Sequence, residues 1–340
     1  MGILGTTWTQ VHPSLVEPGV LNRINQVSQF IRLVAGGAPR IMLTAEDLFV
    51  YVHTLDMRGQ AATNQNAANL LPGATLRLGY ISTPTYRVRA HAEWDHHDAA
   101  NMARNNVNIV EGYRRANRQT IYQTLRNLAL YGFNSNLSEG FLNTPGATAT
   151  NLPPDTFGND SVRTYDNGQM AIFLMNVILQ LKIRTFQYGR PRRFVFLGPQ
   201  RVIAQFQSLN IVQLTSYQRI GSGSATTAEM VAEIAKRTEG DVIEWCYDDT
   251  LIGQGAGGTD AVICMMPEVE QPSGPEWDTN EFARIEPNLA GCAFQYADMA
   301  APLEITVPLA LGAVDTMYEI RSTPGWCVRS EAETIISFPY

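Results

Sequence analysis

Lysine is nearly absent from this sequence. Only Lys182 and Lys236 of its 25 basic residues are lysines, and the others are arginines. Arginine carries a planar guanidinium that suits protein interfaces, whereas the ammonium of lysine is compact and strongly hydrated. A chain so rich in arginine fits a protein that stays in contact with other proteins. A base-composition bias in the gene would leave the same pattern, so both interpretations stay open.

Reactive and metal-binding motifs are lacking as well. The four cysteines form no CxxC pair and have no neighbouring histidine cluster: Cys246, Cys264, Cys292 and Cys327. This spacing argues against a zinc knuckle or a redox motif and favours buried free thiols. The sequence also contains no GxSxG, P-loop or HExxH pattern. We therefore predict no enzymatic activity and no catalytic, cofactor-binding or metal-binding residues.

Long hydrophobic runs are missing too. No apolar stretch is long enough to cross a bilayer, and the N-terminal sequence MGILGTTWTQVHPSL lacks the basic and apolar regions of a secretory signal. Hydrophobic residues make up 45% of the chain, which allows a real core, and the formal net charge is -7. That charge attracts neither nucleic acid nor anionic membranes strongly, although a wall facing packaged DNA can be acidic. We expect a soluble protein made in the cytoplasm.

Two short motifs look chemical. Residues 253–258 read GQGAGG and match G-x-G-x-x-G, but the segment that follows is β-like, whereas a dinucleotide site needs a helix there. We favour a flexible hairpin tip. Residues 94–98 read WDHHD, and adjacent histidines at a helix start point in different directions. We favour a helix cap with exposed imidazoles over a metal site.

One long helix is the strongest local prediction. From residue 98 to residue 131 there is no proline and only one glycine, Gly112, and apolar residues recur at helical spacing. Asp95 or Asp98 can cap its start, and Gly132 follows its end as a C′ glycine should. Such a helix would span about 50 Å. Its polar face is rich in arginine, which indicates a strut rather than a fully buried helix.

A hairpin precedes this helix in the prediction. Residues 75–80 and 85–91 alternate as two strands would, with Tyr86, Val88 and Ala90 on one side of the second strand. Because such a long polar hairpin has little apolar surface to bury, it must lean on something else.

The remaining elements follow from periodicity and turn residues. The first 45 residues read as an irregular arm with one helix at 21–34. Helices are expected at 165–187, 199–209 and 227–237. Strands are expected at 194–197, 242–245, 261–265, 305–309, 315–320, 326–328 and 335–338, with a helical turn at 330–334.

The sequence after the long helix resembles a phage signature. Residues 127–133 read NLALYGF and residues 139–146 read EGFLNTPG. Major capsid proteins of tailed bacteriophages with the Hong Kong 97-like fold, and the related encapsulins, end their spine helix with a similar run. The closing phrase at 318–329, YEIRSTPGWCVR, resembles the last peripheral strands of that family. The order of parts is similar over nearly the whole chain.

The resemblance implies an α+β fold with five segments. They are an N-terminal arm at 1–50, an extended hairpin loop and its base at 51–95, a peripheral domain with the spine helix at 96–187, an axial domain at 188–283, and closing peripheral strands at 284–340. The spine helix would occupy about 96–131.

It also implies a structural function: a major capsid subunit that self-assembles into an icosahedral shell around double-stranded DNA. Its partners would be identical subunits in hexamers and pentamers, packaged DNA bound non-specifically, a portal and a scaffolding protein, with no membrane. Because the sequence opens directly into the arm, we expect the scaffolding protein to be separate. The protein would be part of the virion capsid, assembled in the cytoplasm of the host bacterium.

Contacts between subunits are predicted at the extended loop. We hypothesise that Arg58, Arg77, Arg87 and Arg89 meet carboxylates of adjacent subunits. Some family members lock the shell with lysine–asparagine bonds from this loop, but residues 56–91 contain no lysine, so we expect no such bonds. The alternatives are an encapsulin-like nanocompartment shell and, from a different class, a soluble α/β enzyme built on residues 193–265. Gene neighbours would distinguish the shells, and sizing chromatography would identify the enzyme.

Overall fold

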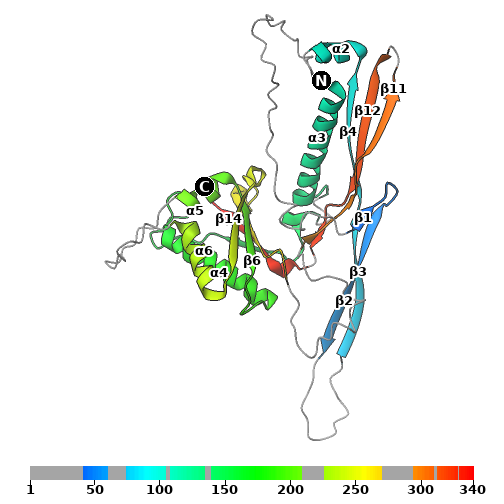
Figure 1. The fold of residues 1–340 in the computed structure, drawn as a ribbon. Coiled ribbons are helices and arrows are strands. Elements are labelled where there is room, and N and C mark those ends of the chain that lie inside the picture. The colour runs from blue at the N-terminus through cyan, green and yellow to red at the C-terminus, as the bar shows by residue number, and fades with distance from the viewer. Residues whose placement is uncertain are drawn as a thin grey trace, which may run out of the picture.

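A computed structural model describes most of the chain: residues 41–59, 74–104, 108–134, 139–208, 226–269, 294–309, 312–327 and 329–340. Two sheets dominate it, one beside the long helix and one in a rounder body that carries the C-terminus, and a two-stranded hairpin projects beyond both (Figure 1). The helix expected at 21–34 and Cys292 lie outside the described residues.

The first sheet is built around the long strand β12 (Val314–Ser322). It pairs antiparallel with β4 (Tyr86–Trp94) on one side and with β11 (Leu303–Pro308) on the other. Near its end it pairs with β10 (Ala297–Met299), which in turn pairs parallel with β1 (Ile41–Leu43). Two further short strands, β9 (Phe294–Gln295) and β13 (Trp326–Cys327), pair with each other.

The expected long helix is two helices. α2 (His96–Arg104) is capped by Asp95, whose Oδ1 accepts a hydrogen bond from the amide of Asp98 at 2.8 Å. α3 (Ile109–Tyr131) begins at its own N-cap, Asn108, whose side chain accepts from the amides of Val110 and Glu111. A capping side chain satisfies amides that a continuous helix would bond internally, so Asn108 starts a new helix. His96 and His97 are exposed, as expected of a cap.

The second sheet has the order β5-β14-β8-β6-β7. β14 and β8 run antiparallel, as do β8 and β6, while the pairs at both ends, β5–β14 and β6–β7, are parallel. Its strands are β5 (Thr148–Asn151), β6 (Arg193–Gly198), β7 (Val242–Tyr247), β8 (Asp260–Met265) and β14 (Glu333–Phe338). The helices beside it are α4 (Asn167–Thr185), α5 (Gln200–Ser208) and α6 (Thr227–Glu239), and the single turns are η3 (Phe141–Asn143), η4 (Asp249–Leu251), η5 (Ala256–Gly258) and η7 (Ser330–Ala332).

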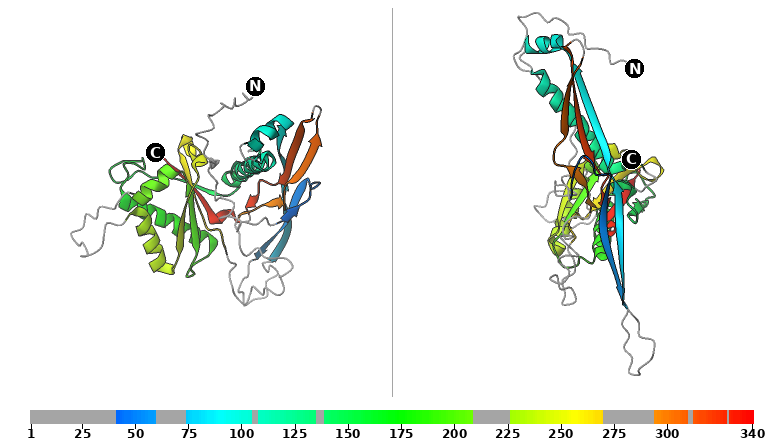
Figure 2. Two further views of the ribbon diagram at one scale, coloured as in Figure 1. Left: turned by 45° about the horizontal axis from the view of Figure 1, so that its top comes forward. Right: turned by 90° about the vertical axis from the view of Figure 1, so that its right-hand side faces the viewer.

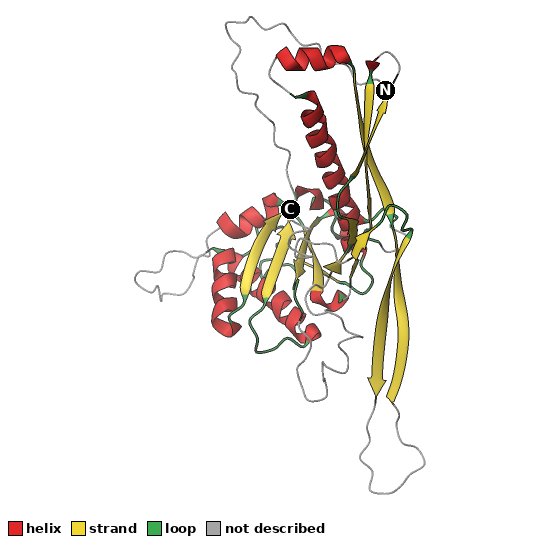
Figure 3. Ribbon diagram, turned by 45° about the vertical axis from the view of Figure 1, so that its right-hand side comes forward, coloured by secondary structure: helices red, strands yellow, loops and turns green. Residues whose placement is uncertain are grey.

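Both faces of the second sheet are buried, because alternate side chains of a strand point to opposite faces. Phe194 and Phe196 of β6 lie in the core with α4, α5 and α6. Val195 and Leu197 lie in a different core, with the end of α3 on the opposite face. In Figure 3 the helices stand on one side of this sheet and α3 approaches from the other.

Helix α3 therefore belongs to two cores. Ile121, Leu125 and Leu128 pack on Tyr318 and Ile320 of the first sheet. In the same turn as Leu128, Ala129 and Leu130 pack against the second sheet, where Leu130 is fully buried. The helix is a strut that fixes one sheet relative to the other.

The turn after α3 explains the residues of the phage-like signature. Gly132 and Gly140 both have a positive φ, and a Cβ on Gly140 would lie 2.3 Å from the amide nitrogen of Gly132. Glu139 accepts hydrogen bonds through Oε2 from the amides of Phe133 and Asn134, at 3.2 and 3.0 Å. The Asn143 side chain donates to the carbonyl of Tyr131 at 3.0 Å, at the end of the helix. Only glycine permits so close an approach of two backbone segments.

The expected hairpin is wrong in its pairing. Residues 75–80 belong to β3 (Ala74–Pro84) and residues 85–91 mostly to β4, but these two strands do not pair with each other. β3 instead forms the hairpin with β2 (Phe49–Gly59), while β4 pairs with β12. Alternation shows that a segment is a strand but does not identify its partner. The partner of β4 is β12, which follows it in the sequence after more than two hundred residues.

Contacts cross the borders of the expected segments, whose ranges stay a prediction. α4 and β5, from residues 96–187, pack with the strands of the expected axial domain, and so does β14 from residues 284–340. The reason is that β14 lies between β5 and β8, so the end of the chain completes the second sheet rather than the first. The naming of an arm, a loop, and peripheral and axial domains stays a prediction.

The turn after α3 can be tested with two glycines. Gly140→Ala places a methyl group against the backbone at Gly132 at a positive φ, so we expect a loss of about 3 kcal/mol or more in the free energy of unfolding. Gly112→Ala is the control, because a Cβ there would meet nothing within 4 Å. In a helix, alanine is also more favourable than glycine by about 1 kcal/mol. Urea unfolding of the purified subunit measures both. Equal effects would contradict this account of the turn.

Candidate assembly surfaces

Beyond its base, where Val50 and Val52 pack with Leu43, Ala297 and Trp326, the β2–β3 hairpin pairs with no other strand of the described chain. Its strands pair only with each other, in register from Phe49 opposite Pro84 to Gly59 opposite Ala74. The hairpin extends beyond both sheets (Figure 2). An isolated two-stranded hairpin is marginally stable in water, so a pairing of this length needs support from elsewhere.

One face of this hairpin is apolar and exposed. On β3, the alternate residues Leu76, Leu78 and Tyr80 are between 67% and 74% exposed, and on β2 Phe49 and Tyr51 are 54% and 58% exposed. The rings of Tyr51 and Tyr80 meet edge to face with centroids 5.9 Å apart, which places both strands' residues on the same side. We call these five residues the apolar face of the hairpin. Such a continuous exposed face marks a surface that meets another protein.

A second exposed apolar row lies on β11, at the edge of the first sheet. Leu303, Ile305 and Val307 alternate along the strand and are between 38% and 48% exposed. Glu304 between them turns toward α3, where its Oε1 lies 3.1 Å from Nη2 of Arg114. Sequence analysis predicted this strand but not its exposed face. The alternating sequence Leu-Glu-Ile-Thr-Val was the available signal.

The four arginines predicted to contact other subunits fall in two groups. Arg58 lies on β2 opposite Thr75, and Arg77 lies exposed on β3; no ion pair of Arg77 occurs within the described chain. Arg87 and Arg89 lie on β4 and share one carboxylate on β12 of the same chain. Their Nε atoms lie 3.6 Å and 2.6 Å from Oε1 and Oε2 of Glu319. Contact of any of the four with another subunit stays a prediction.

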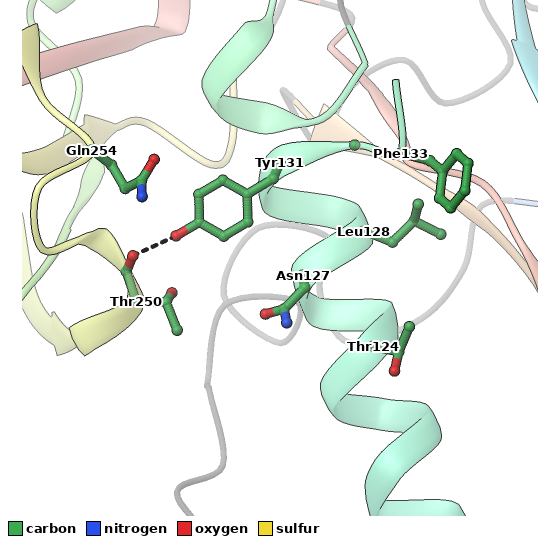
Figure 4. Close-up of a pocket in the computed structure, with 8 residues that line it drawn as sticks. Thr124, Asn127, Leu128, Tyr131, Phe133, Thr250 and Gln254 are labelled. Carbon is green, nitrogen blue, oxygen red and sulfur yellow. Dashed lines mark hydrogen bonds between the residues drawn. The ribbon is translucent and has the colours of Figure 1, made fainter. Parts of the chain in front are cut away.

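A pocket of about 360 Å³ lies where the end of α3 meets η4. The Tyr131 hydroxyl donates to the carbonyl of Thr250 at 2.6 Å across its floor, and Gln254 and Asn127 line its walls (Figure 4). Burial raises the pKa of Tyr131. The described residues that line the pocket offer neutral amides and hydroxyls and include no carboxylate or histidine for proton transfer.

Two carboxyl groups, one buried and one half-buried, have no cation partner among the described residues. Glu333 is 1% exposed, neither of its carboxyl oxygens has a hydrogen-bond partner, and burial raises its pKa well above the ordinary value. Burial also raises the pKa of Asp298 from 3.8 to about 7, although the amide of Met299 donates to Oδ1 at 2.8 Å. Asp298 lies on β10, next to β1, the first strand that the structure describes.

The glycine-rich segment is not built for phosphate. It leads into β8 rather than a helix, and β7 and β8 lie on either side of β6, so it is a crossing connection and not the expected hairpin tip. The amides of Gly253, Gly255 and Ala256 already donate to Asp260, Thr259 and Ser337. Donors engaged in this way cannot cradle a pyrophosphate.

The described part of the chain holds neither a cluster of metal-binding side chains nor a membrane-spanning helix. No group of three or more His, Cys, Asp and Glu side chains there is arranged to hold a metal ion. Likewise, none of the helices among these residues has the length and apolar character needed to cross a membrane.

Comparison with known proteins gives the fold. No protein-family model and no curated protein sequence matches the chain. Among solved structures, the chain is similar to the capsid of Myoviridae phage XM1, with 13% identity, a TM-score of 0.66, and coverage of 95% of this chain and 96% of that one. It is also similar to the capsid of an empty GTA particle, with 12% identity, a TM-score of 0.57 and 96% of both chains covered.

A third similar structure is the capsid of the cyanophage P-SCSP1u, with 11% identity, a TM-score of 0.55, and coverage of 98% of this chain and 93% of that one. Each likeness spans nearly the whole chain. The chain therefore has the mixed helix and sheet fold of phage capsid proteins, and the expected fold class is confirmed.

Asp298 generates a pH prediction. Folding raises the pKa of this carboxyl, so the folded state holds the proton more tightly than the unfolded state does. Its contribution to stability is fully present below about pH 4 and is lost as the pH rises to about 7. The free energy of unfolding of Asp298→Asn minus that of the wild type should grow by on the order of 1 to 3 kcal/mol across this range and stay constant above it. Urea unfolding between pH 4.5 and pH 8 tests this. Asp160→Asn, in an exposed turn, controls for the loss of one negative charge.

The arginines of β4 and β3 should behave differently when their charge is reversed. Arg89→Glu sets two carboxylates side by side at Glu319, so we expect the Tm of the isolated subunit to fall by about 2 to 4 °C. Arg77→Glu is the control and should leave that Tm unchanged. Calorimetry of both variants measures the effect, and an equal fall in both would refute the assignment of Glu319 as the partner of Arg89.

Proposed function

We propose that this chain is the major capsid subunit of a tailed bacteriophage, which assembles with identical copies into an icosahedral shell around double-stranded DNA. Two observations support this. The fold matches phage capsid proteins over nearly the whole chain. The β2–β3 hairpin also presents an apolar face that the described part of the chain leaves uncovered.

The apolar face of the hairpin is the observation that carries the proposal. Its five large side chains are each more than half exposed. Covering the exposed part of such a side chain is worth on the order of 1 to 2 kcal/mol. In a closed symmetric shell every copy repeats the same contact, so the modest free energies of the single contacts add up over the assembly. A subunit with this surface is incomplete by itself.

The role we propose is structural and not enzymatic. The pocket at the end of α3 is lined without a carboxylate or histidine, and the amides of the glycine-rich segment are already bonded. The proposed partners are identical subunits in hexamers and pentamers, a portal, a separate scaffolding protein, and DNA held without sequence preference. The shell would assemble in the cytoplasm of the host bacterium and become part of the virion.

We extend the proposal to the four arginines of the extended loop. Arg58 and Arg77, on the projecting hairpin, are well placed to meet carboxylates of a neighbouring copy. Arg87 and Arg89 already share Glu319, so a neighbour's carboxylate there would add to an existing ion pair. An encapsulin-like shell would use the same kind of surface. The similar phage and GTA capsids favour a shell that encloses DNA.

Assembly can be tested at the apolar face. In the double variant Leu76→Ser and Leu78→Ser, two exposed leucines become polar, so the subunit should stay folded while shell formation falls at least tenfold. Sedimentation velocity and negative-stain electron microscopy measure the fraction of assembled protein, and circular dichroism checks the fold.

The matched control is Phe157→Ser, which removes a side chain that is 79% exposed in a turn of the other body. It should assemble as the wild type does. Normal shells from the double variant, or a wild-type protein that is monomeric and compact under all conditions, would sink the proposal.

A further inference from the structure

The last turn of α4 carries an arginine without a carboxylate partner. Arg184 donates through Nε to the carbonyl of Gln180 at 3.3 Å, and its two Nη atoms donate to the hydroxyls of Thr148 and Thr334. None of the ion pairs among the described residues includes Arg184. A guanidinium has five N–H donors, so two of them have no acceptor among the described residues.

The residues around this guanidinium are donors as well. Thr148 and Thr334 are direct partners across the β5–β14 pair, and Thr150 lies two residues further along the same face of β5. Because the oxygens of Thr148 and Thr334 accept hydrogens from Arg184, the hydrogen of each hydroxyl is left to be donated. Three hydroxyls and a guanidinium thus converge on one side of the sheet.

These groups open into a pocket of about 330 Å³ between α4 and β5. Asn176 and Gln180 add amide groups to its wall, and Phe173 and Val177 make one side apolar. None of the described residues that line it is acidic. The volume is at the lower end of the range for small-molecule sites, enough for an oxyanion on a short carbon chain.

The charge of Arg184 is poorly compensated inside the chain. Burial lowers the pKa of its guanidinium, which means that the cation has lost part of its hydration. Glu331, whose charge also acts on Arg184, has its own ion pair with Arg329 at 3.7 Å. A cation that is partly removed from water, with no counter-ion among the described residues, is held at a cost that a bound anion would offset.

We propose that the pocket between α4 and β5 binds a small oxyanion, a carboxylate or a phosphate. Arg184 is its counter-ion, the hydroxyls of Thr148, Thr150 and Thr334 donate to its oxygens, and Phe173 packs against its carbon chain where one is present. A guanidinium with two N–H groups to offer suits the paired oxygens of such a group. The site does not depend on shell assembly.

The experiment compares anions at equal ionic strength. The Tm of the full chain is measured in sodium phosphate, sodium acetate and N-acetylglutamate against sodium chloride. We expect at least one of the three to raise the Tm by about 2 °C or more, because a ligand that binds only the folded state stabilises it. A stronger response to the two carboxylates indicates a site for an acidic side chain, such as a second copy would supply, and a stronger response to phosphate indicates a free anion.

Three variants test the residues. Arg184→Gln should abolish the rise, and Thr150→Val, which leaves every bond of Arg184 in place, should reduce it at least twofold. Arg237→Gln removes an arginine with a 70% exposed side chain on α6 and should keep the full rise. If Arg184→Gln fails to fold, Thr150→Val alone decides.

The proposal is overturned if no anion raises the Tm of the wild type, or if the Arg184→Gln or Thr150→Val variant responds as the wild type does. The same measurements in the Leu76→Ser and Leu78→Ser background separate anion binding from assembly, so that either proposal can fail without the other.

Discussion

The structure depends on one helix that is buried in two cores at once. Leu128 of α3 packs on the first sheet, and Leu130, two residues later, is fully buried against the second. Because both contacts lie within one helical turn of a rigid rod, the two sheets cannot move independently without opening a core. The turn that follows, in which Gly140 approaches Gly132, lets the chain leave the helix inside this junction.

Two apolar surfaces lie outside the cores that α3 joins. The first sheet keeps an open edge at β11, and the hairpin that precedes β4 presents its apolar face to solvent. Soluble monomers usually protect such edges with lysine, proline or a covering segment. Of the two protective residue types, lysine and proline, β11 has only one proline, Pro308 at its end. Such exposed surfaces suit contact with other chains, as the proposed shell requires.

The elements themselves could be predicted from sequence where the signal is local. α4 begins behind Asp166 and α6 behind Thr226, whose capping box with Glu229 is complete. The partners of strands could not be predicted, because alternation at β3 and β4 is the same whichever strand lies beside them. The break before α3 was missed because apolar spacing continues through it, although the run Asn105-Asn106-Val107-Asn108 indicated a cap. For the same reason Arg87 and Arg89 could not be separated from Arg77: an alternating strand shows which residues share a face, but not that Glu319 lies on it.

The short link between β3 and β4 has a mechanical consequence. Only Thr85 separates the two strands, and its hydroxyl donates to the carbonyl of Asp47 at 2.5 Å, which ties the base of the hairpin together. A pull along the hairpin is therefore transmitted straight into β4. The force runs parallel to this strand of 9 residues and at right angles to its hydrogen bonds to β12. Loaded in shear, those bonds share the force and must fail together, whereas a peeling load would break them one after another. Tension between neighbouring molecules would thus be carried by the longest strand pairing of the first sheet.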